Sequence, residues 1–515
     1  MSSLPAPDAA RLAAIDEHFH FGLSTEELEE FVPAVAGTLA ASATVERLYE
    51  NVAPPVPDRS WTSPTPGENR LGAWYVKTSV TESAEGPLAG RTVAVKDNVA
   101  VAGVPMMNGS RTVEGFVPRR DATAVRRLLD AGATIAGKSV CEDLCFSGAS
   151  FTSQPGPVRN PWDESRNTGG SSSGSAALVA AGEVDLALGG DQGGSIRLPS
   201  AFCGIVGHKP THGLVPYTGA FPIERTIDHV GPMTRTVADA AAMLGVLAGV
   251  DGFDPRQPDV IEPVDYLAAL AEPAVGLRVG VLTEGFGSPV SDPGVDDAVR
   301  AAVDVLGSAG LAVEEVSIPW HRDALAVWNV IATEGAAHQM LDGNAYGMNI
   351  EDFYDPELIA HYARGRVDHG AALSRTVKLV GLSGRYTYEA GGGKYYGMAR
   401  RLVPEVRAAY DAALARYDVL VMPTVPYTAK EIPPADVSLA DYLYTALSMI
   451  GNTAPFDVTG HPSCSVPTGL VDGLPAGLMI TGRRFDDATV LRVAHTYEQA
   501  VGGFPSASRV RAGLV

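Results

Sequence analysis

Two serines of this 515-residue chain lie in glycine-rich runs, and one lysine ends an apolar run upstream of them. Residues 169–175 read GGSSSGS and contain Ser171, whereas residues 191–197 read DQGGSIR and contain Ser195. Glycine lets backbone N–H groups converge on one point, and a hydroxyl beside them can attack a carbonyl while the amides bind the oxyanion. Lys96 follows TVAV, and a lysine in apolar surroundings releases its proton more readily, so it can act as a base. These three residues suggest a hydrolase that does not use histidine.

A second lysine lies in a pattern typical of phosphate-binding loops. Residues 132–139 read GATIAGKS, which matches G-x-x-x-x-G-K-S. That loop must follow a strand and open a helix. Here the preceding residues favour a helix, Gly132 has the character of its C-cap, and the middle residues favour a strand. The context therefore argues against nucleotide binding.

Ser172 satisfies another pattern, the G-x-S-x-G nucleophile elbow of α/β-hydrolases. An elbow requires a buried strand immediately before it, but residues 160–167 read as a polar loop. A Ser-His-Asp hydrolase stays open as an alternative. Three histidines lie near the motifs: His208, His212 and His229. We expect each of them to be a structural hydrogen-bonding group and not a base.

The four cysteines give little sign of a metal or disulfide site. Cys141 and Cys145 have a spacing compatible with two metal ligands, but no second pair completes a tetrahedral set. We expect them to be buried small residues on one face of a helix, and Cys203 and Cys464 to be core or pocket-lining thiols. Four cysteines in this length are too few for a disulfide framework and favour a reducing cytoplasm.

The composition narrows the class of protein. With 45% hydrophobic and 19% charged residues, the chain resembles a globular protein long enough to bury a large core. A net charge of −21 argues against a nucleic-acid partner and against an anionic membrane. The first residues do not resemble a signal peptide, and no apolar run approaches the roughly 20 residues that span a bilayer. We expect a cytoplasmic protein with a small-molecule substrate.

The beginning of the chain reads as helical. Residues 8 to about 50 favour helix, and Ser24 with Glu27 forms a capping box ahead of apolar residues at helical spacing. A proline-rich linker follows at 54–66. A lone helix of this length is marginal in water, so its apolar face must be covered, either by the core or by the same segment of a second subunit. We expect the homodimer contact, because the core already carries its own complete set of candidate catalytic residues.

From residue 88 onward, short apolar strands alternate with helices. Strands are predicted at 91–95, 134–136, 186–189, 277–282, 313–316 and 419–422, with a helix at 121–130. This pattern predicts an α/β fold with a mixed sheet covered by helices on both faces. Between about 321 and 415 aromatic-rich helical segments replace the strands. The predicted domains are an extension with linker at 1–70, a core at 71–320 and 418–515, and a smaller inserted domain at 321–417.

The motifs together resemble the amidase signature family, serine hydrolases of carboxamides. The resemblance extends from about Leu88 to Phe485 and includes the blocks FCGIVGHKPT at 202–211 and GLPAGLMI at 473–480. The N-terminal extension and the run FPIERTIDH at 221–229 make the chain most similar to bacterial amidases that act on the products of nitrile hydratase. The expected substrate is thus a primary aliphatic or aromatic amide.

The resemblance implies a Ser–cis-Ser–Lys triad with a cis peptide bond between Gly170 and Ser171. Lys96 would accept the proton of Ser171, which takes that of the nucleophile Ser195. The implied oxyanion donors are the N–H groups of Gln192, Gly193, Gly194 and Ser195. Asp191 would hold backbone amides of this loop, Arg197 would be its structural partner, and no metal or organic cofactor is required.

The substrate pocket is harder to read from the sequence. Phe146, Ile227, Trp328 and Ile450 are apolar residues near the motifs or in the predicted insert, and they could line an acyl pocket. Ordinary core packing explains each of them equally well. Two other functions stay open: the amidase subunit of a tRNA-dependent amidotransferase, which shares the triad, and a binding protein without catalysis.

Overall fold

The structure is a computed structural model that describes residues 4–346 and 354–507. The chain divides into two compact units, Met1–Val56 and Pro57–Val515. The predicted extension at 1–70 therefore covers the first unit and the beginning of the second.

The first unit is a pair of helices, α1 (Ala9–Phe19) and α2 (Thr25–Glu50). The predicted capping box is confirmed, because the Ser24 hydroxyl accepts the N–H of Glu27 while the Glu27 carboxylate accepts the N–H of Ser24. His20 adopts a left-handed conformation that ends α1, so the predicted helical region is interrupted there. Leu28 is buried, whereas Phe31 is about half exposed.

The second unit is built on a mixed sheet, which in the described part of the chain has twelve strands in the order β1-β2-β4-β3-β5-β7-β6-β11-β12-β10-β8-β9. Parallel pairs join β3 to β4 and β5, and β8 to β9 and β10; the other pairs are antiparallel. The strands are β1 (Trp61–Thr62), β2 (Trp74–Val80), β3 (Thr92–Lys96), β4 (Thr134–Ser139), β5 (Leu186–Asp191), β6 (Val206–Lys209), β7 (His229–Thr234), β8 (Arg278–Leu282), β9 (Ala312–Val316), β10 (Val419–Pro423), β11 (Ser463–Val471) and β12 (Leu474–Gly482).

Every strand predicted from the sequence is present, and the α/β class with helices on both faces is confirmed. The antiparallel strands β1, β2, β6, β7, β11 and β12 were not foreseen. The β11–β12 hairpin turns at Asp472 and Gly473, with φ of 50° and 81°. Positive φ at both positions is the pattern of a two-residue type I′ turn, for which Asp-Gly is a preferred sequence.

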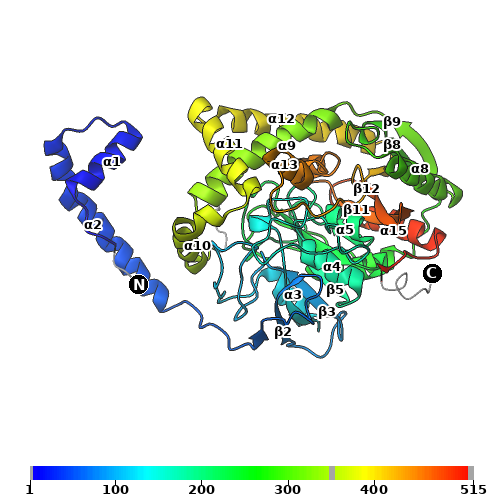
Figure 1. The fold of residues 1–515 in the computed structure, drawn as a ribbon, viewed down its shortest axis with the longest axis horizontal. Coiled ribbons are helices and arrows are strands. Elements are labelled where there is room, and N and C mark those ends of the chain that lie inside the picture. The colour runs from blue at the N-terminus through cyan, green and yellow to red at the C-terminus, as the bar shows by residue number, and fades with distance from the viewer. Residues whose placement is uncertain (1–3, 347–353, 508–515) are drawn as a thin grey trace. The chain divides into compact units, whose positions relative to one another are not determined.

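Helices cover the two faces of the sheet (Figure 1). On one face α4 packs on β3 to β5 and α5 on β6, β11 and β12, while the other helices named here cover the opposite face. These elements are α3 (Thr123–Asp130), α4 (Ser173–Ala181), α5 (Arg197–Cys203), α6 (Val237–Leu247), α7 (Tyr266–Ala269), α8 (Pro293–Ser308) and α15 (Asp487–Ala500).

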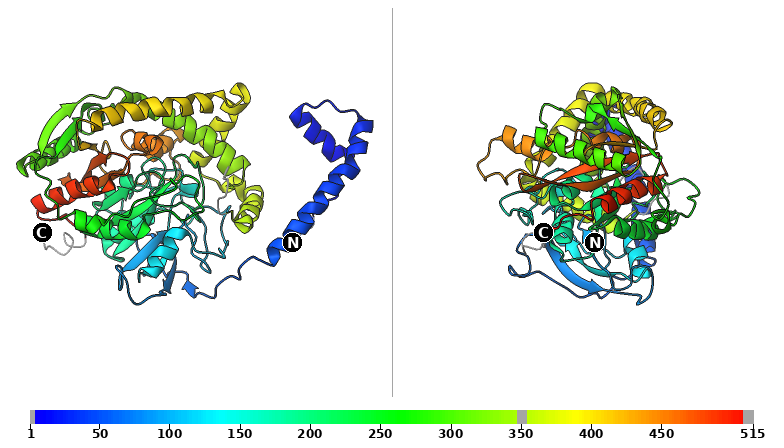
Figure 2. Two further views of the ribbon diagram at one scale, coloured as in Figure 1. Left: turned by 180° about the vertical axis from the view of Figure 1, so that it is seen from behind. Right: turned by 90° about the vertical axis from the view of Figure 1, so that its right-hand side faces the viewer.

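The region between β9 and β10 is helical, as the sequence predicts. Its longest helices contact one another: α9 packs against both α11 and α12 along one side of the unit (Figures 1 and 2). The helices here and beyond β10 are α9 (Trp320–Ala336), α10 (Pro356–His369), α11 (Arg375–Gly391), α12 (Lys394–Leu414), α13 (Leu439–Leu447) and α14 (Ala454–Thr459).

Two motifs have a structural explanation outside catalysis. Lys138, from the phosphate-loop pattern, lies in strand β4 and forms a buried ion pair with Asp97 at 2.9 Å, so this segment is not a phosphate-binding loop. The prediction that Cys141 and Cys145 share a helix face is wrong, because they lie in a loop that ends in the short turn Asp143–Cys145. Both thiols instead donate to the side-chain oxygen of Asn108.

Candidate active site

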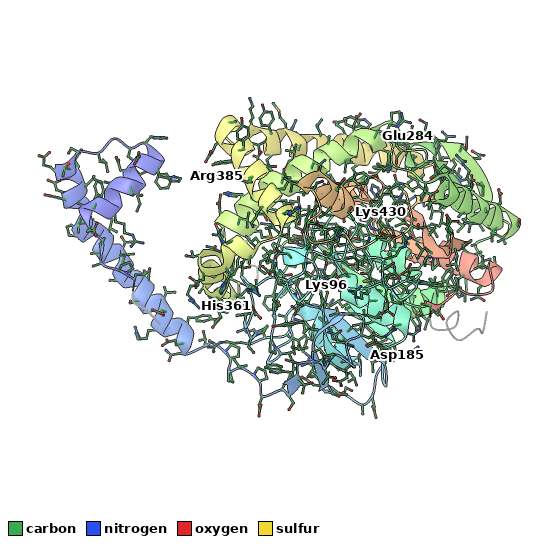
Figure 3. All side chains as sticks on the ribbon, in the orientation of Figure 1. Lys96, Asp185, Glu284, His361, Arg385 and Lys430 are labelled. Atoms are coloured by element: carbon green, nitrogen blue, oxygen red, sulfur yellow. The ribbon has the colours of Figure 1, made fainter. Side chains whose placement is uncertain are left out.

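Lys96 lies at the carboxyl end of β3, which pairs in parallel with β5. Its side chain is fully buried in the interior of the second unit (Figure 3). The side-chain nitrogen Nζ donates to Ser171 Oγ at 2.8 Å and to the carbonyl of Gly190 at 3.0 Å. The strand ends thus bring the predicted lysine and the first predicted serine into direct contact.

Ser171 lies in the loop that enters α4. The Gly170–Ser171 peptide bond is cis, as the resemblance implies. Gly170 has no room for a side chain, because a Cβ there would lie 2.0 Å from the carbonyl oxygen of Ala149. The Ser171 carbonyl accepts the N–H of Glu142 at 3.2 Å. The backbone around Ser171 is therefore held from both sides by buried neighbours.

Ser195 belongs to the loop between β5 and α5. Its carbonyl accepts the N–H of Ser172, the residue after Ser171, so the backbones of the two predicted catalytic serines are adjacent. Ser172 itself opens α4 after an irregular loop, and its hydroxyl contacts the backbone of Gly190. The strand that a nucleophile elbow requires before Ser172 is absent from the described residues at this point.

The Asp191 carboxylate holds the loop 191–197 by hydrogen bonds to its backbone. It accepts the N–H groups of Gly194 at 2.5 Å and Ile196 at 3.0 Å. Gly194 was predicted to be an oxyanion donor, but its N–H is directed to Asp191. The backbone hydrogen bonds described for the chain give no acceptor to the N–H groups of Gln192, Gly193 or Ser195.

Arg197 is a fully buried partner of Asp191. Its guanidinium donates to both carboxylate oxygens of Asp191 at 3.0 Å and to Asp457 at 2.7 Å. Although burial opposes ionisation, the positive charge of Arg197 and its hydrogen bonds hold the pKa of Asp191 well below its usual range. The carboxylate that braces the loop is therefore ionised at neutral pH.

Two side chains from distant segments hold consecutive carbonyls of the same loop. Trp328 Nε1 donates to the carbonyl of Gln192, and Thr453 Oγ1 donates to that of Gly193, both at 2.6 Å. In a trans peptide the C=O and the following N–H point in opposite directions. Fixing the Gln192 carbonyl therefore fixes the direction of the Gly193 N–H.

A cavity that opens to solvent adjoins this loop. Ser195 lines it together with all four predicted pocket residues: Phe146, Ile227, Trp328 and Ile450. The other lining residues are Cys145, Ser147, Gly148, Gln192, Gly193, Leu198, Ile223, Ala332 and Leu447. The structure thus places the predicted nucleophile at the end of a mostly apolar cavity.

Several residues of this site carry no signal in the sequence. Ile223, Ala332 and Leu447 are apolar like many core residues, and only their position at the cavity distinguishes them. Thr453 precedes a short helix and does not belong to a recognisable motif.

Two buried groups beside the serines have shifted ionisation. Burial raises the pKa of Glu142 to about 7, although Thr152 donates two hydrogen bonds to this carboxylate. Burial opposes ionisation of Cys145, but its contact with Cys141 and the charge of Lys96 lower its pKa to about 7. Cys145 is thus an active-site thiol that the sequence did not distinguish from a core cysteine.

The three histidines near the motifs make structural hydrogen bonds, as expected. His208 contacts Asp487, and His212 and His229 contact backbone carbonyls. Burial lowers the pKa of His212 to about 3.

In the described ranges, 4–346 and 354–507, no cluster of three or more His, Cys, Asp or Glu side chains is arranged to hold a metal ion. The helices of those same ranges also include none that is long and apolar enough to cross a membrane.

The sequence profile of the family described as Amidase matches residues 57–491. The chain belongs to the amidase signature family. An enantioselective amidase of Rhodococcus rhodochrous is 70% identical over 509 residues, which cover 98% of each chain. Among solved structures, a glutamyl-tRNA(Gln) amidotransferase subunit of Thermotoga maritima is 33% identical with a TM-score of 0.68, covering 82% of this chain and 87% of that one. The peptide amidase of Stenotrophomonas maltophilia is 31% identical with a TM-score of 0.66, covering 82% and 84%.

Proposed function

We propose that this amidase hydrolyses primary aliphatic or aromatic carboxamides to a carboxylic acid and ammonia through an acyl-enzyme on Ser195. The observation that carries the proposal is the 2.8 Å hydrogen bond between Lys96 Nζ and Ser171 Oγ, beside a cavity that Ser195 lines. A lysine, a bridging hydroxyl and a second hydroxyl at a cavity form the relay that acyl transfer requires without histidine.

Acylation begins when neutral Lys96 accepts the proton of Ser171, which accepts that of Ser195. Ser195 Oγ attacks the amide carbonyl, and the carbonyl oxygen gains the negative charge. The N–H groups of Gln192, Gly193 and Ser195 stabilise this oxyanion, while Gly194 contributes through its bond to Asp191 by shaping the loop. Ser171 then gives a proton to the nitrogen and regains one from Lys96, the C–N bond breaks, and ammonia leaves.

Deacylation uses the same groups in reverse. Water gives a proton to Ser171, which passes its own proton to Lys96, and the water oxygen attacks the ester carbon. Lys96 returns a proton through Ser171 to Ser195 Oγ when the acid leaves. Asp191 and Arg197 touch neither substrate nor nucleophile; they keep the loop in place as a buried ion pair. No step requires a metal or an organic cofactor.

The acyl group of the substrate would occupy the apolar cavity. Phe146, Ile227, Trp328 and Ile450 offer it aromatic and aliphatic contacts with few polar groups. Such a lining favours uncharged aliphatic or aromatic acyl groups.

The test is ammonia release by the purified chain alone from benzamide, propionamide and glutamine. We expect turnover of the first two amides without any added protein or metal. Turnover of glutamine only, or a requirement for partner subunits, would instead support the amidase subunit of a tRNA-dependent amidotransferase. The absence of any turnover would support a binding protein without catalysis.

We further infer a cytoplasmic homodimer without a nucleic-acid partner. The four cysteines are free, buried thiols, which suits a reducing compartment, and the charge of −21 disfavours nucleic acid.

In the first unit, Phe31 and Leu48 of α2 are about half exposed, and a second copy could cover them. Light scattering should show a dimer for the full chain and a monomer for a chain that begins at Pro57. That start keeps Arg59, whose side chain binds Asp121. A monomeric full chain would contradict the dimer.

A further inference from the structure

Gln192 has a side-chain oxygen that lacks an internal hydrogen-bond donor. The residue is 5% exposed and lines the cavity together with Ser195. Its Oε1 atom has no hydrogen-bond partner among the described residues. A buried polar atom without a partner is destabilising, because it has lost its hydrogen bonds to water. Such an atom beside a nucleophile is explained most simply by a donor that arrives with the ligand.

The neighbouring tyrosine determines which way the Gln192 amide faces. Tyr217 donates its single hydroxyl proton to the carbonyl of Phe221 at 3.0 Å. The Tyr217 oxygen can then only accept, and it faces Gln192 at 3.1 Å and Asn98 at 3.4 Å. The oxygen and nitrogen of an amide are assigned from such networks. The atom of Gln192 that faces Tyr217 is therefore the NH₂ group, and Oε1 faces away from Tyr217.

The backbone of Gln192 is fixed as well. Its carbonyl accepts the indole N–H of Trp328 at 2.6 Å. The next residue, Gly193, packs so closely on the same ring that a Cβ there would lie 2.7 Å from it. Tyr217 and Trp328 therefore hold Gln192 at both ends, so its free acceptor has a defined position before substrate binds.

We propose that Gln192 Oε1 accepts a hydrogen bond from the nitrogen of the scissile amide, and that Tyr217 is a positioning residue for this contact. The proposal rests on the proposed amidase function. A primary carboxamide carries two N–H donors on that nitrogen, whereas an ester of the same acid has none. The contact therefore selects amides over esters with an identical acyl group.

The same hydrogen bond assists departure of the nitrogen. In the tetrahedral intermediate, an N–H held by Gln192 restrains rotation about the C–N bond. The nitrogen lone pair can then face Ser171 and take its proton. The C–N electron pair goes to nitrogen, the oxyanion restores the C=O bond, and ammonia leaves with the Ser195 ester in place.

The experiment measures kcat/KM for benzamide and methyl benzoate, which share one acyl group. Gln192→Met keeps the backbone N–H and the length of the side chain but removes the acceptor. We expect the amide-to-ester ratio of kcat/KM to fall at least about 10-fold, because a site built to bind an N–H loses that discrimination. Tyr217→Phe should lower the ratio in the same direction by a few fold, because the amide of Gln192 is then free to turn.

Thr453→Val is the matched control. It removes the hydrogen bond to the Gly193 carbonyl of the same loop, and both substrates need the oxyanion donors. Its two kcat/KM values should therefore fall together and leave the ratio within about 2-fold. Thr453→Ser should restore both.

A binding measurement covers the case of very slow ester turnover. In the Ser195→Ala background, Gln192→Met should weaken benzamide binding several fold but not that of methyl benzoate. An unchanged ratio together with unchanged benzamide affinity would overturn the role of Gln192. If the wild-type chain hydrolysed no amide at all, the proposed function itself would have failed first.

Discussion

The cavity has two walls that are built in different ways. The polar wall consists of Gln192, Gly193 and Ser195, which line the cavity, together with the residues behind them, Lys96, Ser171 and the rest of the loop 191–197. Its atoms are held by hydrogen bonds and by the buried ion pairs of Arg197. The acyl wall consists of Phe146, Ile227, Trp328 and Ile450, which come from four distant segments and meet by packing. Positions set by hydrogen bonds are specific to fractions of an ångström, whereas apolar packing tolerates exchange of one side chain for another of similar volume. Changes in the polar wall should therefore affect the chemical step, and changes in the acyl wall should affect substrate choice.

The largest effect is expected from Ser195→Ala. Loss of the nucleophile should lower kcat at least about 1,000-fold, while little packing volume is lost and the fold is kept. Steady-state ammonia release and a thermal unfolding curve check both points. Ser172→Ala is the matched control, because this neighbouring serine satisfies the elbow pattern but contacts only backbone at Gly190. A loss of kcat in Ser172→Ala as large as that in Ser195→Ala would mean that the nucleophile has been assigned to the wrong serine.

Substitutions of the relay residues Lys96 and Ser171 should have the next largest effect on kcat. Lys96→Ala removes the base, and Ser171→Ala removes the bridge between base and nucleophile; we expect kcat to fall by about 10²- to 10⁴-fold, more for the lysine. KM for benzamide should change little, since neither residue belongs to the acyl wall. Single-turnover kinetics separate the two constants. An unchanged rate in Lys96→Ala would remove lysine from the mechanism.

A substitution in the acyl wall should behave differently. Ile450→Phe adds volume to the cavity that Ser195 lines, so it should reduce kcat/KM for benzamide about 10-fold relative to propionamide. The kcat for propionamide should stay within a few fold of the wild-type value, because the polar wall is untouched. Competition between the two amides gives the ratio directly. Equal losses for both amides would mean that Ile450 supports the polar wall and not the acyl group.

The smallest effect concerns stability and not turnover. The backbone N–H of Glu142 donates to the Ser171 carbonyl. Burial raises the pKa of Glu142 to about 7 from an ordinary 4.5. Between these values the folded chain keeps a proton that the unfolded chain releases, so this group's contribution to stability falls as pH rises, by at most about 1.4 kcal/mol per pH unit. Glu142→Gln lacks this titration, and its advantage over the wild type should grow from pH 5 to 7 and then stay constant. Urea unfolding at four pH values tests this, and parallel curves would contradict it.

The two walls also differ in how far the sequence predicts them. Lys96, Ser171 and Ser195 lie in short glycine-rich or strand-like runs, and local chemistry suffices to select them. The strand ends that join them follow from the alternation of apolar segments. The antiparallel strands β1, β2, β6, β7, β11 and β12 lack that regular alternation with helices and were missed.

The sequence predicts the acyl wall only in part. Phe146, Ile227, Trp328 and Ile450 were selected only as apolar residues near the motifs or in the predicted insert, and the other apolar residues that line the cavity were missed. Ile223 and Leu447 resemble any buried aliphatic residue, and only the fold brings them to the cavity. Thr453 and Trp328 hold carbonyls of the 191–197 loop from more than a hundred residues away. Hydrogen bonds of this range leave no local pattern. The role of Gly194 was misjudged for the same reason, because the position of Asp191 decides which N–H groups are free.

The most direct test of the account is the identity of the acylated residue. The chain is mixed with benzamide, quenched in acid within the first turnovers, digested and analysed by mass spectrometry. We expect a benzoyl group on Ser195, present in the wild type and absent from Ser195→Ala. A benzoyl group on Ser172, or on the active-site thiol Cys145, would contradict it.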